Sequence, residues 1–347
     1  MELHSRMARW ATAAALVALI VGLSPPSALA GTRARARAGV GFLASQQQPN
    51  GSIPAFSPVG STADAVLAMV SAGHGRRQVR RAMGFLERKV VHGRARSVGL
   101  KAKVTLAAVA AGEDPRSFGG VNLVRAIRTT EGTDGRLGAS TPVFEDALGI
   151  LALEAAGATV SRRALTWLAS AQCPDGGWQY DEPYGPTTDD QHCLDQTSPG
   201  SDYFQSDTNT SGIAVQALNG PAGRPAPSLG AHPFGFFTAI RDSAFGGWGY
   251  SWGVQTTDAN STALVIQAYV SAGKRLPSGA MRALKALQYP LCGAWAYTWI
   301  GDPGSATRTP PDVGATIGAI PAALLAAMPI FPGGPLGPAP DAPPCPS

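Results

Sequence analysis

Three groups of carboxylic acids are candidates for acid–base chemistry, although neither of the adjacent pairs forms a known catalytic motif. Glu145 and Asp146 are adjacent, Asp189 and Asp190 are adjacent, and Asp258 opens the segment Asp-Ala-Asn-Ser-Thr. A side chain that gives a proton to a substrate must stay protonated, which takes burial and neighbouring hydrogen-bond donors. We assign no catalytic residue; if the protein is an enzyme, Asp258 and Asp146 are the candidate acids. The competing interpretation of Asp258 is helix N-capping, in which its carboxylate accepts backbone N–H groups.

Aromatic side chains gather in three loops that share a glycine-rich pattern. Five of the seven tryptophans lie in these loops. Large rings near a cavity mouth suit the binding of a flat or apolar molecule. For Trp178 and Trp248 the alternative is packing between successive repeats. The candidate ligand-binding residues are Trp178, Tyr180, Trp248, Tyr250, Trp252, Trp295, Tyr297 and Trp299.

The cysteines predict two disulfides. There are four of them, and an even number in an exported chain favours bridges over metal binding. Cys173 and Cys193 flank one long loop, so we pair them, which leaves Cys292 with Cys345. The alternative is a zinc or calcium site on the acidic loop, with ligands from Asp189, Asp190, His192, Cys193 and Asp195. The spacing matches no standard zinc pattern, so we predict no metal and no cofactor.

Internal repeats indicate the elements that must position these side chains. Six Ala-rich segments with helical periodicity end in Ala-Gly or an equivalent, and between them lie further helices that stop before turns. Each repeat is therefore predicted to form a helix, a turn and a second helix. We predict an all-α fold, an alpha/alpha toroid of about twelve helices in a double ring, with an open solenoid as the alternative. The small residues suit inner helices, and Asp207, Asp258 and Asp312 suit their N-caps.

The two ends of the chain differ from the repeats. Residues 1–30 have a basic start, a short apolar run and Ala-Leu-Ala before Gly31, which predicts a secretion signal peptide. Residues 31–328 form the single toroid domain in this interpretation. Residues 329–347 are rich in Pro and Gly, which predicts a disordered or loosely attached tail. We therefore expect a secreted protein with no transmembrane anchor after cleavage.

Charge is distributed unevenly along the chain. From 76 to 103 there are ten Lys or Arg and one acid, whereas from 175 to 207 there are eight acids and no Lys or Arg. A solvated outer helix accounts for the basic run, and a docking surface for an anionic envelope component is the alternative. No aromatic residues are interleaved with these arginines, so we predict no nucleic-acid binding.

One sequence pattern resembles a known superfamily. Gln172 is followed by Asp-Gly-Gly-Trp ending at Trp178, and Asp-Ala-Asn-Ser-Thr-Ala opens a later helix at Asp258. This pattern resembles the repeat of the squalene-hopene cyclases and protein prenyltransferases, and most closely that of their small exported actinobacterial relatives. The resemblance spans residues 38 to 328. It implies an alpha/alpha toroid with a central cavity.

The catalytic residues of that superfamily do not carry over. Its cyclases take their proton donor from Asp-x-Asp-Asp, and the aligned position here is Asn260, whose amide cannot do this work. Its prenyltransferases hold zinc with Asp, Cys and His. After the signal peptide the histidines are His74, His92, His192 and His232, and only His192 lies near a cysteine.

These observations favour ligand binding over catalysis. We predict an exported protein that binds an apolar or tetrapyrrole-like molecule, an isoprenoid or a corrinoid, in its central cavity. A membrane transporter or a second binding chain is the expected partner, because vitamin B12 carriers of this superfamily close their toroid with a second domain. The alternatives are a terpene cyclase or isomerase with a non-standard acid and a purely structural envelope role.

Overall fold

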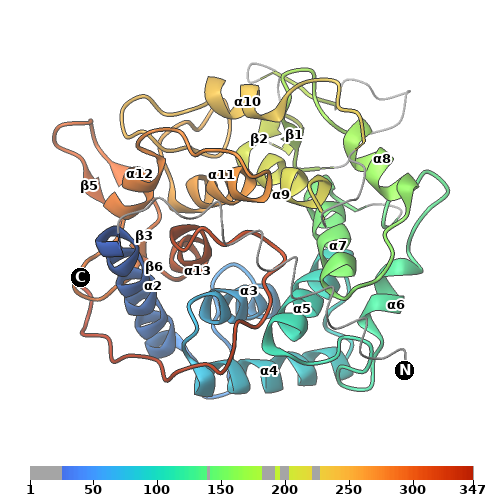
Figure 1. Cartoon of the computed structure of the whole chain (residues 1–347), viewed down its shortest axis with the longest axis horizontal. Helices are drawn as coiled ribbons and strands as arrows, with labels where there is room; N and C mark the ends of the chain where they lie inside the picture. The colour runs from blue at the N-terminus through green and yellow to red at the C-terminus, as the bar shows by residue number, and fades with distance from the viewer. Residues whose placement is uncertain (1–25, 139–140, 182–191, 196–202, 221–226, 347) are drawn as a thin grey trace.

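The structure is a computed structural model that describes residues 26–138, 141–181, 192–195, 203–220 and 227–346. The described chain forms twelve helices in two concentric rings (Figure 1), which confirms the predicted alpha/alpha toroid. The inner ring consists of α3 (Pro58–Ser71), α5 (Val98–Ala111), α7 (Val143–Ala155), α9 (Thr208–Leu218), α11 (Ala259–Ser271) and α13 (Val313–Ala323). The outer ring consists of α2 (Pro26–Gln46), α4 (Arg76–Val91), α6 (Leu123–Arg128), α8 (Arg162–Ser170), α10 (Pro233–Ala239) and α12 (Ala280–Ala286).

The rings close because each inner helix packs against the next, and α13 packs against α3. Inner helices such as α5 are Ala-rich and buried on nearly all sides, whereas α4 buries one apolar face and exposes its arginines. Inner and outer helices alternate along the chain, so the inner helices run parallel. Their N-termini therefore gather at one end of the ring and their C-termini at the other.

One loop structure recurs between an outer helix and the next inner helix. The indole Nε1 of Trp178, Trp248 and Trp295 donates to a carbonyl of the preceding outer-helix segment, at 2.7, 2.6 and 3.0 Å. The backbone N–H of each tryptophan donates to a hydroxyl of the next inner helix. Short antiparallel pairs β1–β2 (Trp178–Gln179 with Ser206–Asp207) and β3–β6 (Trp295–Ala296 with Pro311–Asp312) join loop and helix start. A third pair is β4–β5 (Trp299–Ile300 with Thr307–Arg308).

In four of the loops, a polar side chain at the start ties one repeat to the next. Gln172 donates to Gly176 O within its loop and to Ala231 O near α10. Gln47 and Arg241 make the equivalent pairs of bonds. Gln288 does so across the seam of the ring, because its amide donates to Gly293 O and to Arg35 O of α2. The last repeat is thereby joined to the first.

Both predicted disulfides are present. Cys173 is bonded to Cys193, and Cys292 to Cys345, so Cys193 supplies no thiolate for the alternative metal site. In the chain-entropy model bridges of this kind stabilise by about 2–4 kcal/mol. Within the described ranges no cluster of three potential metal ligands occurs, while Asp189 and Asp190 lie outside these ranges.

The C-terminal segment is held more closely than its composition predicts. After α13 it crosses the middle of the ring and passes α4 (Figure 1). Met328 N–H donates to Gln216 Oε1 of α9 at 2.9 Å, and Gly337 exchanges backbone hydrogen bonds with Gly73 and Gly75 at the α3–α4 turn. The Cys292–Cys345 bridge holds its end. Its prolines restrict the chain without preventing these contacts.

The N-terminal prediction concerns residues that are mostly outside the described ranges. Helix α2 begins at Pro26, so cleavage before Gly31 would remove its first residues. Among the described helices, none has the length and apolar character needed to cross a membrane.

Candidate functional site

A central cavity of about 400 Å³ lies inside the inner ring. Its apolar wall comes from side chains of every inner helix except α5 and from the segment after α13, where Met328 and Ile330 lie across the C-terminal ends of the inner helices. Phe56, Phe144 and Tyr180 flank the other end, and Phe144 and Tyr180 stack with ring centroids 5.9 Å apart. The remaining apolar lining residues are Leu67, Leu148, Ile213, Leu264, Ile317 and Pro321.

Only one charged pair lines this cavity among the described residues. Asp64 on α3 and Lys103 on α5 form a half-buried salt bridge across adjacent inner helices. The two charges neutralise each other, so the pair makes this part of the cavity wall polar but gives it no net charge.

Two amide side chains in the cavity wall have oxygens that accept no hydrogen bond. Asn209 on α9 and Gln267 on α11 both line the wall. Asn209 Oδ1 and Gln267 Oε1 are buried, and neither accepts a hydrogen bond from a described residue. A buried oxygen without a donor costs about 1–3 kcal/mol. Rotation of either amide group would turn its oxygen towards the cavity, where a ligand hydroxyl or N–H group could donate to it.

The position aligned with the cyclase proton donor faces the same cavity. Asn260 lies on the wall, and a Cβ added to Gly318 of α13 would come within 2.9 Å of its Oδ1. Glycine at 318 is therefore what lets α13 approach Asn260. An amide here can donate and accept hydrogen bonds but cannot act as an acid.

The two candidate catalytic acids do not line this cavity. Asp258 is the N-cap of α11, and its oxygens accept from Ser261 N and Ser261 Oγ, both at 2.7 Å. Burial raises its pKa to about 6, although these hydrogen bonds oppose the shift. Asp146 in α7 accepts from Leu137 N at 2.7 Å, and burial raises its pKa to about 7.

A third buried acid, Asp207, also has a structural role as a helix N-cap. Asp207 caps α9 by accepting from the N–H groups of Asn209 and Thr210, and burial raises its pKa to about 7. Glu145 likewise has a structural role, because it accepts from Gly99 N at the start of α5. The geometry thus supports N-capping for Asp207 and Asp258.

Of the eight candidate aromatic residues, one lines the central cavity, and that is Tyr180. Trp178, Trp248 and Trp295 are fully buried in the wall and make the repeat contacts described above. Trp252 donates to Asp175 Oδ2, and Trp299 stacks on Phe245 and contacts Arg308. Tyr250 and Tyr297 lie near Asp207 and Asp258, where burial raises the pKa of Tyr297 to about 12.

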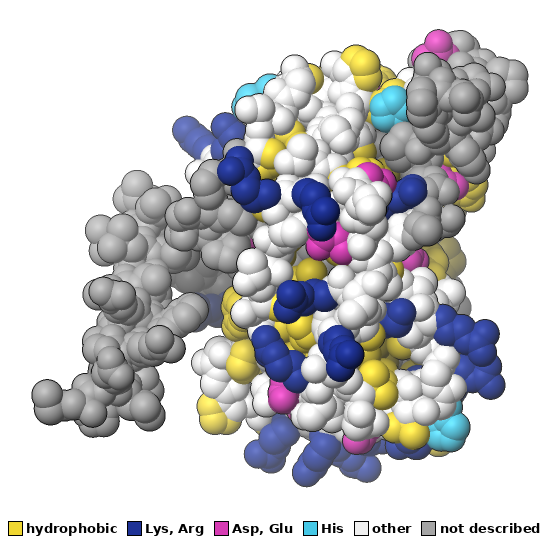
Figure 2. All heavy atoms as spheres, turned by 90° about the vertical axis from the view of Figure 1, so that its right-hand side faces the viewer, with side chains coloured by type: hydrophobic (Ala, Val, Ile, Leu, Met, Phe, Trp, Pro, Cys, Tyr) yellow, Lys and Arg dark blue, Asp and Glu magenta, His cyan; other side chains and the backbone are white. Residues whose placement is uncertain are grey.

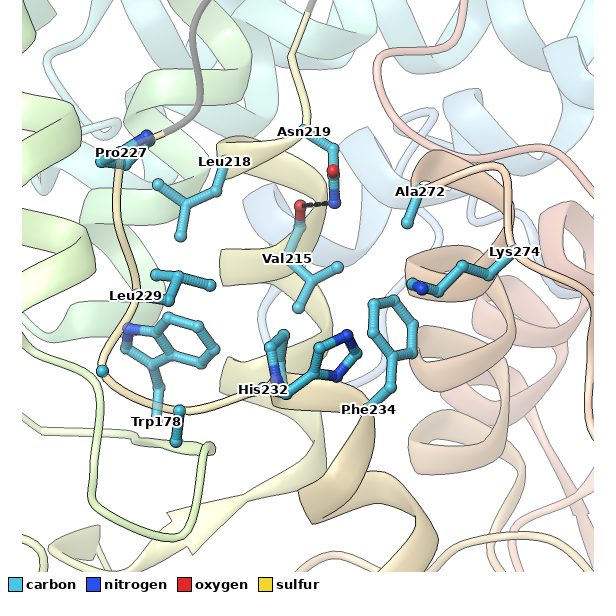
Figure 3. Close-up of a pocket in the computed structure, with 13 residues that line it drawn as sticks. Trp178, Val215, Leu218, Asn219, Pro227, Leu229, His232, Phe234, Ala272 and Lys274 are labelled. Atoms are coloured by element: carbon cyan, nitrogen blue, oxygen red, sulfur yellow. Dashed lines mark hydrogen bonds between the residues drawn. The ribbon is translucent and has the colours of Figure 1, made fainter.

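A separate outer groove of about 440 Å³ lies at the C-terminal ends of α9 and α11. Figure 3 shows His232 beside Phe234, with the Lys274 side chain next to the Phe234 ring. The Lys274 Nζ atom lies 5.1 Å from the centroid of the Phe234 ring, and the buried Trp178 forms part of the floor. The Lys274 ammonium is thus already engaged with an aromatic face.

Sequence reasoning missed most of the cavity wall. Asn260, Leu264 and Gln267 recur at intervals of four and three, which places them on one face of α11. This periodicity can be seen in the sequence and predicts that the three residues share one face of the helix. It does not predict whether that face points towards the axis of the ring. Met328 and Ile330 carry no such pattern, because they lie after the last helix.

Comparison with known proteins supports the fold and leaves the activity open. No family model matches the sequence, and none of the curated proteins is similar to it. A possible GH105 family member from Salmonella enterica aligns with 10% identity over 87% of this chain and 96% of its own, with a TM-score of 0.56. An α-1,6-mannanase of Salegentibacter, inactivated at two aspartates and bound to a mannotetraose, aligns with 12% identity, 86% and 99% coverage and a TM-score of 0.53.

These likenesses define the class of protein as an alpha/alpha toroid. A type II terpene cyclase from Scytonema also aligns over 88% of this chain and all of its own, with 14% identity, but its TM-score is 0.37. At such identities the toroid is shared and the chemistry is not transferred.

Proposed function

We propose that this toroid binds one small, mostly apolar molecule that carries a hydroxyl group. The observation that carries the proposal is a pair of amide side chains, Asn209 and Gln267, which lie in an apolar wall and whose oxygens accept from no described residue. Apolar surface supplies the affinity and a few polar groups fix the orientation in sites of this kind. An isoprenoid alcohol combines both properties.

The volume of the cavity favours an isoprenoid over a corrinoid. About 400 Å³ is near the lower end of the usual range for small-molecule sites, which is roughly 300–1,000 Å³. A corrinoid with its nucleotide arm is several times bulkier than a sesquiterpene alcohol. The segment containing Met328 also occupies one end of the ring, where a large ligand would have to extend.

The carboxyl groups of the described cavity wall support binding without a chemical reaction. Glycoside hydrolysis takes two carboxyl groups on either side of the scissile bond. Among the described residues only Asp64 lines the cavity with a carboxylate, and it is paired with Lys103. A cyclase would need a protonated acid facing the ligand, and neither Asp146 nor Asp258 does so. The proposal is therefore a carrier or sensor, not a hydrolase or cyclase.

Export and delivery complete the proposed role. The two disulfides support folding in an oxidising compartment, in agreement with the signal peptide expected over residues 1–30. A carrier of an apolar molecule outside the cytoplasm must hand it on, so we infer a membrane transporter or a second binding chain as the recipient.

Farnesol and farnesyl methyl ether test the role of the hydroxyl group. Both have the same apolar chain, but the ether cannot donate a hydrogen bond. We expect the disulfide-intact protein to bind farnesol about fivefold more tightly, since a hydrogen bond to a neutral acceptor contributes roughly 1 kcal/mol. Isothermal titration calorimetry in a common detergent background measures the two affinities.

A matched pair of variants locates the effect. Gln267→Leu removes one of the two amides and keeps the apolar bulk, so we expect the preference for the alcohol to fall to the part that Asn209 alone supports. Gln255→Leu makes the same exchange at an exposed loop position and should retain the preference. Equal affinity for alcohol and ether in the unmodified protein would refute the proposal, as would a preference that survives Gln267→Leu unchanged.

A further inference from the structure

A second hollow lies at the seam where the last repeat meets the first. It has a volume of about 560 Å³ and is bounded by α2, α12, the turn after α12 and β5. Four of its lining side chains are cations and none is an acid among the described residues. This seam pocket is lined by Arg35, Arg282, Lys285, Ala286, Gln288, Pro290 and Arg308.

The repeat architecture does not require this concentration of charge. An equivalent groove lies beside Gln172, the counterpart of Gln288 at another repeat junction. That groove is lined by a single cation, Arg162, together with apolar and small polar residues. The same structural joint is therefore built there without a cationic cluster, so the joint itself does not require the charge of the seam pocket.

Contacts within the pocket hold two of its cations in place. Arg35 Nη1 donates to Gln288 Oε1 at 3.2 Å, while Gln288 Nε2 donates to Arg35 O at 3.0 Å. Arg308 Nε donates to Ala286 O at 2.7 Å, and its guanidinium lies over the rings of Tyr289 and Trp299 at 5.3 and 5.8 Å. Both guanidinium groups keep further N–H donors that bond to no described residue.

The other two cations are uncompensated. Among the described residues, neither Arg282 nor Lys285 forms a salt bridge. Burial, and then the nearby charge of Arg35, lowers the pKa of Lys285. Four positive groups that face one hollow repel one another, and an anion placed among them would relieve that repulsion.

We propose that the seam pocket binds an oxyanion of the phosphate type, a diphosphate or a phosphate monoester. Arginine forks and a lysine ammonium suit the several oxygens and multiple charge of such groups better than a single carboxylate. This proposal is independent of the one for the central cavity. Because Arg35 belongs to the first helix and the other three cations to the last repeat, a bound anion would also strengthen the closure of the ring.

A free phosphate compound and a phospholipid headgroup present the same chemistry. The disulfide-intact protein is therefore titrated with inorganic pyrophosphate by isothermal titration calorimetry. In parallel, its sedimentation is measured with phosphatidylcholine vesicles that contain or lack phosphatidic acid. Binding of pyrophosphate identifies a free ligand, and binding to the phosphatidic acid vesicles alone identifies a headgroup.

A charge-matched control is needed because the chain is basic overall, with a formal net charge of +5. On the face shown in Figure 2, Lys and Arg side chains are spread widely and acidic ones are few. Arg282→Gln with Lys285→Gln removes two charges from the seam pocket, both from side chains that are not fully buried. Arg76→Gln with Arg77→Gln removes two from the exposed start of α4.

We expect the seam variant to bind pyrophosphate, or the phosphatidic acid vesicles, about tenfold or more weakly than the unmodified protein. The α4 variant should bind as the unmodified protein does. Pyrophosphate should also raise the melting temperature of the unmodified protein and not that of the seam variant. Absence of binding to both probes would overturn the proposal, and so would equal weakening in the two variants.

Discussion

Asp146→Asn will stabilise the folded protein at pH 8 and leave its stability unchanged at pH 4. Burial raises the pKa of Asp146 from its ordinary value of 3.8 to about 7 in the folded state. At pH 4 the folded protein therefore holds a neutral carboxylic acid, which the asparagine amide resembles in size and polarity. At pH 8 the same group is a buried carboxylate, and only Leu137 N–H donates to it at short range among the described residues.

The direction follows from proton binding in the two states. Between about pH 4 and pH 7 the folded state binds more protons at Asp146 than the unfolded state, so the free energy of unfolding falls as the pH rises. The rise of this pKa from 3.8 to about 7 corresponds to roughly 4 kcal/mol, which sets the upper limit of the gain at pH 8. Asp207 has the same direction of shift and the same cause.

Urea unfolding of both proteins at pH 4, 6 and 8 measures this effect. We expect the difference in unfolding free energy to be near zero at pH 4 and to reach about 2–4 kcal/mol in favour of the variant at pH 8. Asp341→Asn, at an exposed position in the C-terminal segment, is the control and should show no trend. A constant difference at all three pH values would contradict the account of Asp146.

Trp248→Ala will lower the free energy of unfolding by about 3–5 kcal/mol. The Trp248 ring is fully buried, its Nε1 donates to Phe237 O at 2.6 Å and Arg241 lies over its face. Removing the ring leaves a cavity between the outer and inner rings and an unpaired carbonyl. Trp248→Phe should lower the free energy of unfolding by less, about 1–3 kcal/mol, because most of the apolar bulk remains. The remaining cost arises because the Phe237 carbonyl still loses its donor.

Trp252→Ala provides the comparison for Trp248. Trp252 lies in the same loop but is only half-buried, and its Nε1 donates to Asp175 at the surface. We expect Trp252→Ala to lower the free energy of unfolding by less than half as much as Trp248→Ala in the same urea titration. If both substitutions cost the same, the repeat contact of Trp248 would not be the main source of its stabilising effect.

The toroid and its joints could be predicted because they depend on local, repeated patterns. Glycine followed by tryptophan, a capping aspartate and an Ala-rich helix recur with little change, and each contact they make lies within one repeat or between neighbours. The pairing of Cys173 with Cys193 followed from the same local reasoning. Physical contacts that recur at fixed spacing leave a signature in the sequence.

The cavity wall could not be predicted in the same way. Which face of α9 or α11 meets the axis depends on how all the helices pack, and a polar side chain such as Gln267 carries no mark of that choice. The loop sequences predict either ligand binding or packing between repeats for Trp178 and Trp248, and the full burial of both rings supports packing. The segment with Met328 and Ile330 reaches the cavity through contacts with α9 and the α3–α4 turn, far apart in sequence.

Native mass spectrometry of the disulfide-intact protein equilibrated with farnesol tests the central claim most directly. We predict a complex with one farnesol per chain that is lost in Leu264→Trp, where a larger side chain projects into the cavity, and is retained in Ile300→Trp, an exposed position on β4. No complex in the unmodified protein, or a complex that persists in Leu264→Trp, would contradict the assignment of the central cavity as the binding site.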